Sequence, residues 1–333
     1  MAETRARISI VMPLYNKEGE VSRAIKSVLA QNFSDFELLV INDGSTDKGP
    51  EVVRQIEDKR VSIIDQDNGG VSAARNRGIE EAKSDFITFL DADDEWKTDF
   101  LESVIRMRRN FPDCKVFGTN YLYRNVDGFL MSTILRGLPK APWEGVLEDY
   151  FKVASHSDPP ISSSAVAVVK EALASIGGFP VGVTTGEDLL TWARLASRYK
   201  IAYSTQPAAI FHLRESLRGR PTRIPDPIDT VGQELKKILK EEKHENVYGL
   251  KEFIAHWHQM RASVFLRLGK RKEAIYEVKE IARYSKKNFK LYLFFVIALL
   301  PQKIWNWGLR NTNYLEYYSR RRTIPKNIIS VSR

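Results

Sequence analysis

Four carboxylates fall within five residues in the first third of this sequence: Asp91, Asp93, Asp94 and Glu95. They follow an apolar run, Phe86 to Leu90, whose β-branched and aromatic content predicts a buried strand. Carboxylates packed this closely repel one another and raise each other's pKa, and a divalent cation removes that penalty. Oxygen ligands suit Mg²⁺ or Mn²⁺, and Mg²⁺ completes its coordination shell with substrate phosphates. Taken alone, the stretch fits a metal–diphosphate site and a solvated acidic turn equally well.

Strands and helices alternate in front of this acidic stretch. Apolar runs predict three earlier strands, at Arg7–Met12, Glu37–Ile41 and Val61–Ile64. Apolar residues at helical spacing predict a helix after each of them, at Glu18–Gln31, Val52–Ile56 and Val71–Ala82. Such alternation predicts a parallel sheet joined by right-handed crossovers. We therefore expect an α/β fold with a mainly parallel sheet flanked by helices.

Polar loops follow all four strands, at Pro13–Glu18, Asp43–Asp47, Asn68–Ser72 and Asp91–Glu95. In a parallel sheet these loops meet along one edge, which is where open α/β sheets bind ligands. Their convergence favours the metal–phosphate interpretation of the acidic stretch. Two nucleotide-binding motifs are missing, because no G-x-G-x-x-G follows the first strand and G-x-x-x-x-G-K-[ST] occurs nowhere. The sequence therefore argues against a dinucleotide-dependent dehydrogenase and a P-loop enzyme.

The next part of the chain adds three strand-like patterns and a helix with an acidic start. The strands are expected at Val116–Arg124, Ile161–Val169 and Ala202–Leu213, with an irregular insertion over the site between the first two. The helix begins at Glu187 and Asp188. Acidic residues are favoured at a helix N-terminus simply as caps, so this pair is open to a structural and a chemical interpretation.

A basic, proline-rich linker, Arg218–Pro227, separates this part from a helical one. We predict a first domain over residues 1–217, the linker at 218–227, and a smaller all-helical C-terminal region at 228–333. Of the net charge of +9, residues 226–333 carry +11, from 22 Lys and Arg against 11 Asp and Glu. A basic region of this kind suggests nucleic acid or an anionic membrane surface as its partner.

Leu291 to Leu300 is a run of ten apolar residues inside the basic region. As a helix it spans about 15 Å at ~1.5 Å per residue, too short for the ~30 Å hydrocarbon core of a membrane. One interpretation is a monotopic anchor dipped into the cytoplasmic leaflet; the other is a helix packed on the protein or on a partner subunit. The chain starts without an apolar leader and has one cysteine, Cys114. We therefore expect a cytoplasmic protein without disulfides, peripheral on the cytoplasmic face of the membrane under the first interpretation.

Five motifs occur in order along roughly residues 7–215: Pro13-x-Tyr15-Asn16, Asn42-Asp43-Gly44-Ser45-x-Asp47, Gly70-x-Ser72-x-Ala74-Arg75-Asn76-x-Gly78, Asp91-x-Asp93-Asp94, and Gly177-Gly178-Phe179 followed by Glu187-Asp188. Together they resemble the family-2 inverting nucleotide-sugar glycosyltransferases, which have the GT-A fold. The resemblance implies that residues 1–217 are a GT-A catalytic domain that moves one hexosyl unit to an acceptor hydroxyl. Processive members carry Q-x-x-R-W after the base, whereas Leu189–Arg194 follows it here. We therefore predict one sugar per encounter.

The resemblance also implies roles for individual residues. Asp188 is the expected catalytic base, and Asp93, with His212, is expected to hold Mn²⁺ or Mg²⁺ against the departing diphosphate. Asp43 is expected to accept an N–H from the nucleotide base; we predict a uridine donor, although a carboxylate also accepts an N–H from guanine. Further nucleotide-sugar contacts are expected from Pro13, Tyr15, Asn16, Glu18, Gly70, Ser72, Arg75, Asp91 and Ala92. Acceptor-side contacts are expected from Gly178, Phe179, Glu187 and Trp192.

We expect a saccharide or lipid-linked saccharide as acceptor, in the assembly of surface polysaccharide or glycolipid, and no nucleic acid partner. Two other classes stay open. A nucleotidyltransferase needs a glycine-rich basic loop after the first strand, and Pro13–Glu18 offers one Lys and no Gly. A non-catalytic nucleotide-sugar-binding or scaffold protein has no need for Asp93 and Asp188. The sequence leaves open the sugar, the nucleotide, the linkage, the metal and the oligomeric state.

Overall fold

The computed structural model describes residues 8–213, 224–242 and 247–285, and within them ten strands form one sheet. The order is β3-β2-β1-β4-β9-β6-β10-β5, with β7 on β6 and β8 on β10. The strands are β1 (Ile8–Leu14), β2 (Phe36–Asp43), β3 (Val61–Gln66), β4 (Phe86–Phe89), β5 (Glu95–Trp96), β6 (Val116–Arg124), β7 (Leu130–Ser132), β8 (Glu144–Val146), β9 (Val166–Val169) and β10 (Ile201–His212).

The first four predicted strands pair in parallel, in the order β3-β2-β1-β4. Leu14 lies opposite Asn42, and Asn42 lies opposite Asp65, so these strands end together and bring the polar loops to one edge. β6 and β10 are also parallel, whereas β5, β7, β8 and β9 pair antiparallel with their neighbours. The α/β class with flanking helices is confirmed, and the sheet is mixed because β9 enters between β4 and β6 in the opposite direction.

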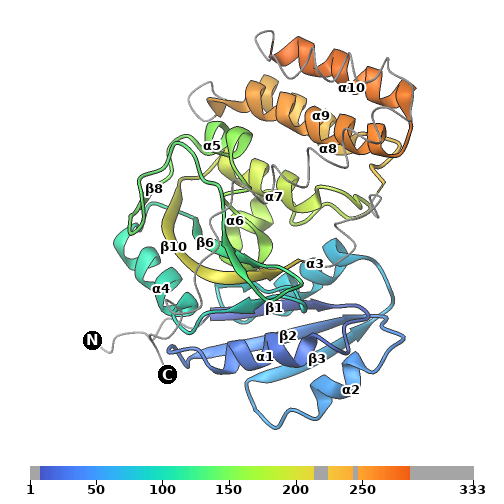
Figure 1. Cartoon of the computed structure of the whole chain (residues 1–333). Coiled ribbons are helices and arrows are strands. Elements are labelled where there is room, and N and C mark those ends of the chain that lie inside the picture. Colours follow the sequence, from blue (N-terminus) through green and yellow to red (C-terminus); the bar gives the residue numbers. More distant parts are fainter. Residues whose placement is uncertain (1–7, 214–223, 243–246, 286–333) are drawn as a thin grey trace.

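Helices cover both faces of the sheet (Figure 1). They are α1 (Val21–Leu29), α2 (Gly49–Arg54), α3 (Val71–Glu81), α4 (Phe100–Asn110), α5 (Tyr150–His156), α6 (Lys170–Ser175), α7 (Glu187–Ala196), α8 (Thr230–Glu241), α9 (Leu250–Arg267) and α10 (Arg271–Tyr284). Side chains alternate across a strand. Ile8, Ile10 and Met12 of β1 therefore belong to the apolar cluster that includes α1 and α4, while Val11 belongs to the cluster on the other face that includes α3, α5 and α7.

The C-terminal helices α8 and α9 contribute to the apolar cluster that contains Val11. Leu235 of α8 and Phe253 of α9 belong to the same apolar cluster as Leu190 of α7 and Val11 of β1. In Figure 1 the three C-terminal helices stack above α5 and α7, with α10 outermost. The predicted all-helical region is thus present over its described part, and it buries apolar surface against the sheet-bearing part.

No helix in the described ranges is both long and apolar enough to cross a membrane. The apolar run Leu291–Leu300 lies outside the described residues, as does most of the predicted linker.

Candidate functional site

The loop after β2 is fastened to the loop before α3 by one buried carboxylate. Asp43 is 2% exposed. It accepts hydrogen bonds from the backbone N–H groups of Gly69 (2.8 Å) and Gly70 (2.9 Å) and from Nε2 of Gln66 (2.8 Å). A carboxylate has about four acceptor positions; two of them hold the glycine turn that begins α3, and a third accepts from Gln66 at the end of β3. Contact between Asp43 and a nucleotide base stays a prediction for the remaining position.

The loop after β1 is fastened to the loop after β2 in a similar way. Asn16, whose φ is 52°, accepts a hydrogen bond at Oδ1 from the N–H of Thr46 (2.8 Å). Glu18 accepts one at Oε2 from the N–H of Lys48 (2.9 Å). Tyr15, by contrast, is 48% exposed. Asn16 and Glu18 therefore join the two loops while staying exposed, and contact of the exposed Tyr15 ring with a nucleotide stays a prediction.

The acidic stretch after β4 divides into inward and outward carboxylates. Asp94 is 4% exposed, accepts a hydrogen bond from Oγ of Ser164 (2.7 Å), and lies 3.3 Å from the backbone nitrogen of His212. Burial, together with the charges of Asp91 and Asp93, raises the pKa of Asp94 well above its ordinary value. Asp94 therefore anchors the stretch, and it is not available as a ligand.

Asp91 and Asp93 keep part of their surface open, with 31% and 25% of each side chain exposed. Lys17 Nζ lies 2.6 Å from Asp93 Oδ2, and Arg23 donates to the Asp93 carbonyl oxygen. Burial and the Asp91 charge raise the pKa of Asp93 to about 6. Two neighbouring carboxylates that are partly exposed, one of them with a raised pKa, fit a hard divalent cation such as Mg²⁺ or Mn²⁺.

Glu95, the last carboxylate of the acidic stretch, pairs with His212. His212 Nε2 lies 3.2 Å from Glu95 Oε1, and Arg124 Nη2 lies 3.0 Å from the same oxygen. Burial by itself raises the pKa of Glu95, but the hydrogen bonds and charges of His212 and Arg124 outweigh it and lower the pKa. The His212 ring thus lies beside the acidic stretch and faces Glu95, and a role for it as a metal ligand stays a prediction.

Arg75 of α3 connects the acidic stretch to the start of α7. Its side chain is 3% exposed; Nη2 lies 2.7 Å from Asp91 Oδ1 and Nη1 lies 3.8 Å from Glu187 Oε1. The guanidinium also stacks over Phe179, 5.0 Å from the ring centre. Burial by itself lowers the pKa of Arg75, but the carboxylates of Asp91, Glu187 and Asp188 raise it by more. Arg75 is therefore a buried, permanently charged bridge between two groups of predicted site residues.

The glycine turn before α7 is held by Asn76, the neighbour of Arg75. Asn76 Oδ1 accepts from the N–H of Phe179 (2.8 Å), and Nδ2 donates to the Phe179 carbonyl (2.8 Å). Gly178 has a φ of 70°, and a Cβ there would lie 2.5 Å from Asn76 Oδ1. Phe179 and Trp192 are core residues, 1% and 0% exposed, with ring centres 5.6 Å apart. Of the predicted acceptor-side residues, these two can therefore act only through packing.

A pocket of about 570 Å³ lies between the start of α3 and the segment before α7. It is lined by Gly69, Gly70, Val71, Ser72, Gly182, Val183, Thr184, Thr185, Glu187 and Ile224. It therefore brings two predicted nucleotide-side residues, Gly70 and Ser72, together with Glu187. Asp188 is the residue after Glu187 and is not among those that line the pocket; it is half-buried, and its Oδ1 accepts from the N–H of Leu189 (2.7 Å). The segment 182–185 and Ile224 were not anticipated from the sequence.

Residues 9–151 match the family described as Glycosyl transferase family 2. The chain contains a glycosyl transferase family 2 domain. The matched part of this domain holds the loops after β1, β2 and β3 and the acidic stretch after β4. Glu187, Asp188 and His212 lie beyond it, so their place in the site rests on the contacts described above.

Similar curated proteins come from several bacteria. TuaG of Bacillus subtilis, a glycosyltransferase named for teichuronic acid biosynthesis, is 27% identical over 208 residues, which are 61% of this chain and 77% of TuaG. The chain spans between 19% and 49% of the length of the first curated relatives that it matches.

Solved structures share the fold over most of the chain. The structure of residues 1–349 of S. aureus TarS with UDP-GlcNAc has a TM-score of 0.66 at 19% identity, covering 93% of this chain and 92% of that one. The mannosyltransferase PcManGT of Pyrobaculum calidifontis, solved with GDP-Man and Mn²⁺, has a TM-score of 0.56 at 16% identity, covering 94% and 88%. The GT-A-like fold predicted from the sequence is thereby confirmed for the family 2 domain.

Proposed function

We propose that this protein is a metal-dependent glycosyltransferase that moves one sugar from a nucleotide-sugar to an acceptor hydroxyl with inversion. The observation that carries the proposal is the Arg75 bridge, at 2.7 Å from Asp91 and 3.8 Å from Glu187. It brings the acidic stretch after β4 and the first turn of α7, which carries Asp188, to one site beside the pocket. TarS and PcManGT, which share the fold, were solved with UDP-GlcNAc and with GDP-Man and Mn²⁺, which supports a nucleotide-sugar donor and a divalent cation.

Asp188 is the proposed general base. Its carboxylate sits in the first turn of α7, next to Glu187. It takes the proton of the acceptor hydroxyl as that oxygen attacks the anomeric carbon from the face opposite the nucleotide, which inverts the configuration. Glu187 points instead toward Arg75. The two adjacent carboxylates therefore have different roles: Glu187 fixes the start of α7 to Arg75, and Asp188 takes the proton.

The donor is proposed to lie on the outward side of the acidic stretch, between the Tyr15 ring and the start of α3. When bound, a divalent cation at Asp91 and Asp93 supplies Lewis-acid stabilisation of the leaving diphosphate. Lys17 Nζ, now 2.6 Å from Asp93, would have to leave that carboxylate, and its charge is then free for a phosphate oxygen. A uridine nucleotide is the proposed donor.

The acceptor is proposed to be a saccharide, free or linked to a lipid, in surface-polysaccharide or glycolipid assembly. TuaG, which is named for teichuronic acid biosynthesis, supports this class. A lipid-linked acceptor also fits the prediction that the C-terminal region, with its net charge of +11 in residues 226–333, meets the cytoplasmic face of a membrane.

A panel of nucleotide sugars tests the function directly. The full chain is incubated with UDP- and GDP-sugars in Mn²⁺, in Mg²⁺ and in chelator, and scored for nucleotide binding and for slow hydrolysis of the donor. We expect at least one donor to bind and hydrolyse only with the cation present. Binding without any turnover, in wild type and Asp188→Asn alike, would instead support the non-catalytic binding protein. Absence of binding to every donor would refute the proposal.

A further inference from the structure

The backbone just before Glu187 rests on a tryptophan from the C-terminal helices. Gly186 has a φ of 81°, in the left-handed region where side chains are strained. A Cβ at Gly186 would lie 2.6 and 2.7 Å from two atoms of the Trp257 ring and 3.5 Å from Val231 Cγ2. Trp257 is itself 3% exposed. The indole of α9 is thus in direct contact with the residue that caps α7, and no side chain fits between them.

The indole is fixed in this position by a hydrogen bond as well as by packing. Trp257 Nε1 donates to Asp229 Oδ1 at 3.0 Å. The same oxygen accepts the N–H of Gly232 at 3.0 Å, so that Asp229 is also the N-cap of α8. One carboxylate therefore sets both the start of α8 and the orientation of the ring that supports Gly186.

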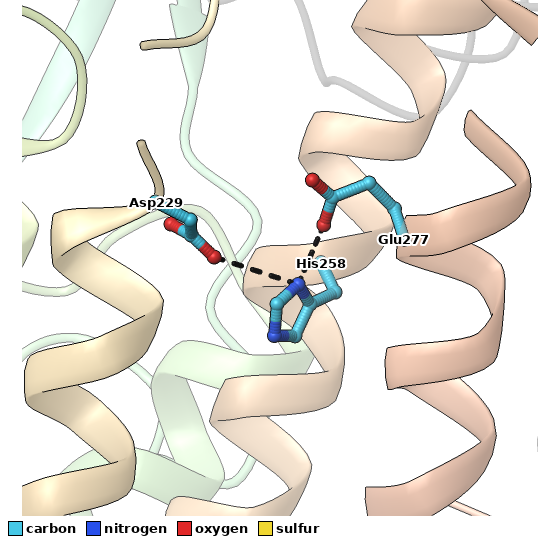
Figure 2. A group of neighbouring side chains, drawn as sticks. All are labelled: Asp229, His258 and Glu277. Carbon is cyan, nitrogen blue, oxygen red and sulfur yellow. Dashed lines mark hydrogen bonds and ion pairs between the residues drawn. The ribbon is translucent and has the colours of Figure 1, made fainter. Parts of the chain in front are cut away.

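Asp229 belongs to a buried charge network that joins three helices. Figure 2 shows the His258 ring between Asp229 and Glu277, with Nδ1 facing both carboxylates. His258 Nδ1 lies 2.6 Å from Glu277 Oε2 and 3.8 Å from Asp229 Oδ2. Arg261 completes the group, with Nε 2.8 Å from Glu277 Oε1 and Nη1 3.7 Å from Asp229 Oδ1. The network therefore ties α10 and α9 to the start of α8.

The composition of this group resembles a metal site, since ligand atoms of Asp229, His258 and Glu277 lie within 4.8 Å of one another. Arg261, however, already supplies a positive charge to both carboxylates. The 2.6 Å separation of His258 and Glu277 is a hydrogen-bond distance, whereas two ligands of one tetrahedral zinc lie about 3.3 Å apart. The group is accordingly a set of paired charges that holds helices together.

A second connection reaches the same segment from the linker. The carboxylate of Asp226 accepts hydrogen bonds from the backbone N–H of Thr184 (3.0 Å) and from its hydroxyl. Arg261 Nη2 lies 3.3 Å from the Asp226 carbonyl oxygen. Thr184 lines the pocket and stands two residues before Gly186. The C-terminal part thus holds the segment 184–186 at both of its ends.

We propose that Trp257 is a positioning residue for the base, Asp188, acting through Gly186, and that the C-terminal helices are part of the frame of the active site. This inference rests on the proposed function of Asp188. Because Gly186 caps α7, a shift of its backbone moves the first turn of that helix, and with it both Glu187 and Asp188. A displacement of about 1 Å in a reacting group can lower turnover by up to ~10²-fold.

The test compares Trp257→Ala with Leu266→Ala, a buried residue of the same helix (0% exposed). We expect both variants to melt at lower temperature, because both leave a cavity. Only Trp257→Ala should lower kcat for donor hydrolysis, by about ten-fold or more, with the Kd for the nucleoside diphosphate within about two-fold of wild type. Trp257→Phe keeps a ring but loses the bond to Asp229, so its kcat should lie between those of Trp257→Ala and Leu266→Ala. This variant also serves if Trp257→Ala fails to fold.

Hydrogen exchange gives a second readout that does not depend on turnover. Amides in a peptide spanning residues 184–192 should exchange faster in Trp257→Ala than in Leu266→Ala. If wild type turns over no nucleotide sugar, the proposed function is wrong, while exchange still decides whether Trp257 holds this segment. A kcat within two-fold of wild type in Trp257→Ala, or exchange no faster than in Leu266→Ala, would overturn the inference.

Discussion

Replacing Arg75 with methionine removes the charge that joins the two halves of the site while keeping an apolar chain against Phe179. The guanidinium is 3% exposed, and its two carboxylate partners differ, since Glu187 is 8% exposed and Asp91 is 31% exposed. Removing one member of a buried ion pair costs about 3–5 kcal/mol, because the partner's charge is left uncompensated. Solvent reaches part of Asp91, which places Arg75→Met near the lower value, about 3 kcal/mol.

Calorimetry and thermal melting measure this cost. In a chain longer than 250 residues, 3 kcal/mol corresponds to a Tm lower by roughly 6 °C. The destabilisation arises from ionised carboxylates, so it should shrink as the pH falls toward about 4, where Asp and Glu take up protons. Arg75→Lys keeps the charge but cannot reach both partners with a planar fork, so it should lie between Arg75→Met and wild type.

The pH dependence is the sharper part of this test. A loss that arose only from packing in the core would be the same at pH 7 and at pH 4. The reasoning is refuted if Arg75→Met melts within 2 °C of wild type, or if its deficit is independent of pH over that interval.

Four further outcomes follow from the site and its surroundings. Asp188→Asn should leave donor affinity near normal and lower transfer by about 10²-fold or more, whereas a residue that only caps α7 would leave kinetics unchanged, since Asn caps well. Asp93→Ala should weaken both cation-dependent donor binding and turnover, and full activity of this variant in chelator would contradict the metal site. Gly78→Ala should destabilise by about 1–3 kcal/mol, because its Cβ would lie 2.2 Å from Val11 Cγ1, and Val11→Ala should restore part of the loss. The full chain should sediment with anionic liposomes at low salt and a chain ending at Lys287 should not; failure of both to bind would favour packing of Leu291–Leu300 on protein.

The strands and helices of the first half could be predicted closely because local pattern determines them. β1, β2 and β4 are buried on both faces, so their sequences are nearly continuous apolar runs, and α1 shows apolar residues at helical spacing. The polar loops could be placed on one edge of the sheet because neighbouring parallel strands end together. The direction of β9 could not be predicted, because a short apolar run pairs equally well in either direction.

The contacts that organise the site depend on residues far apart in the chain. Lys17 was visible as the one cation in the first loop, but nothing local indicates that it meets Asp93. The tasks of Asn16 and Glu18 in joining two loops are likewise invisible, because the same side chains would suit a ligand. Trp257 carries no sequence signal toward Gly186, since an aromatic residue on a helix is ordinarily explained by the helix's own core.

The position of β9 sets the smallest piece of this protein that can be expected to fold. β9 lies between β4 and β6 in the sheet, yet its residues, Val166–Val169, come after the segment 9–151 that the family description recognises. A fragment cut at residue 151 would leave one side of β4 without its hydrogen-bonding neighbour and β6 without both β9 and β10. Exposed strand edges of this kind pair with other chains and aggregate. A segment exchanged between relatives, by recombination or by design, therefore has to extend to His212 or beyond, well past residues 9–151, which match the family.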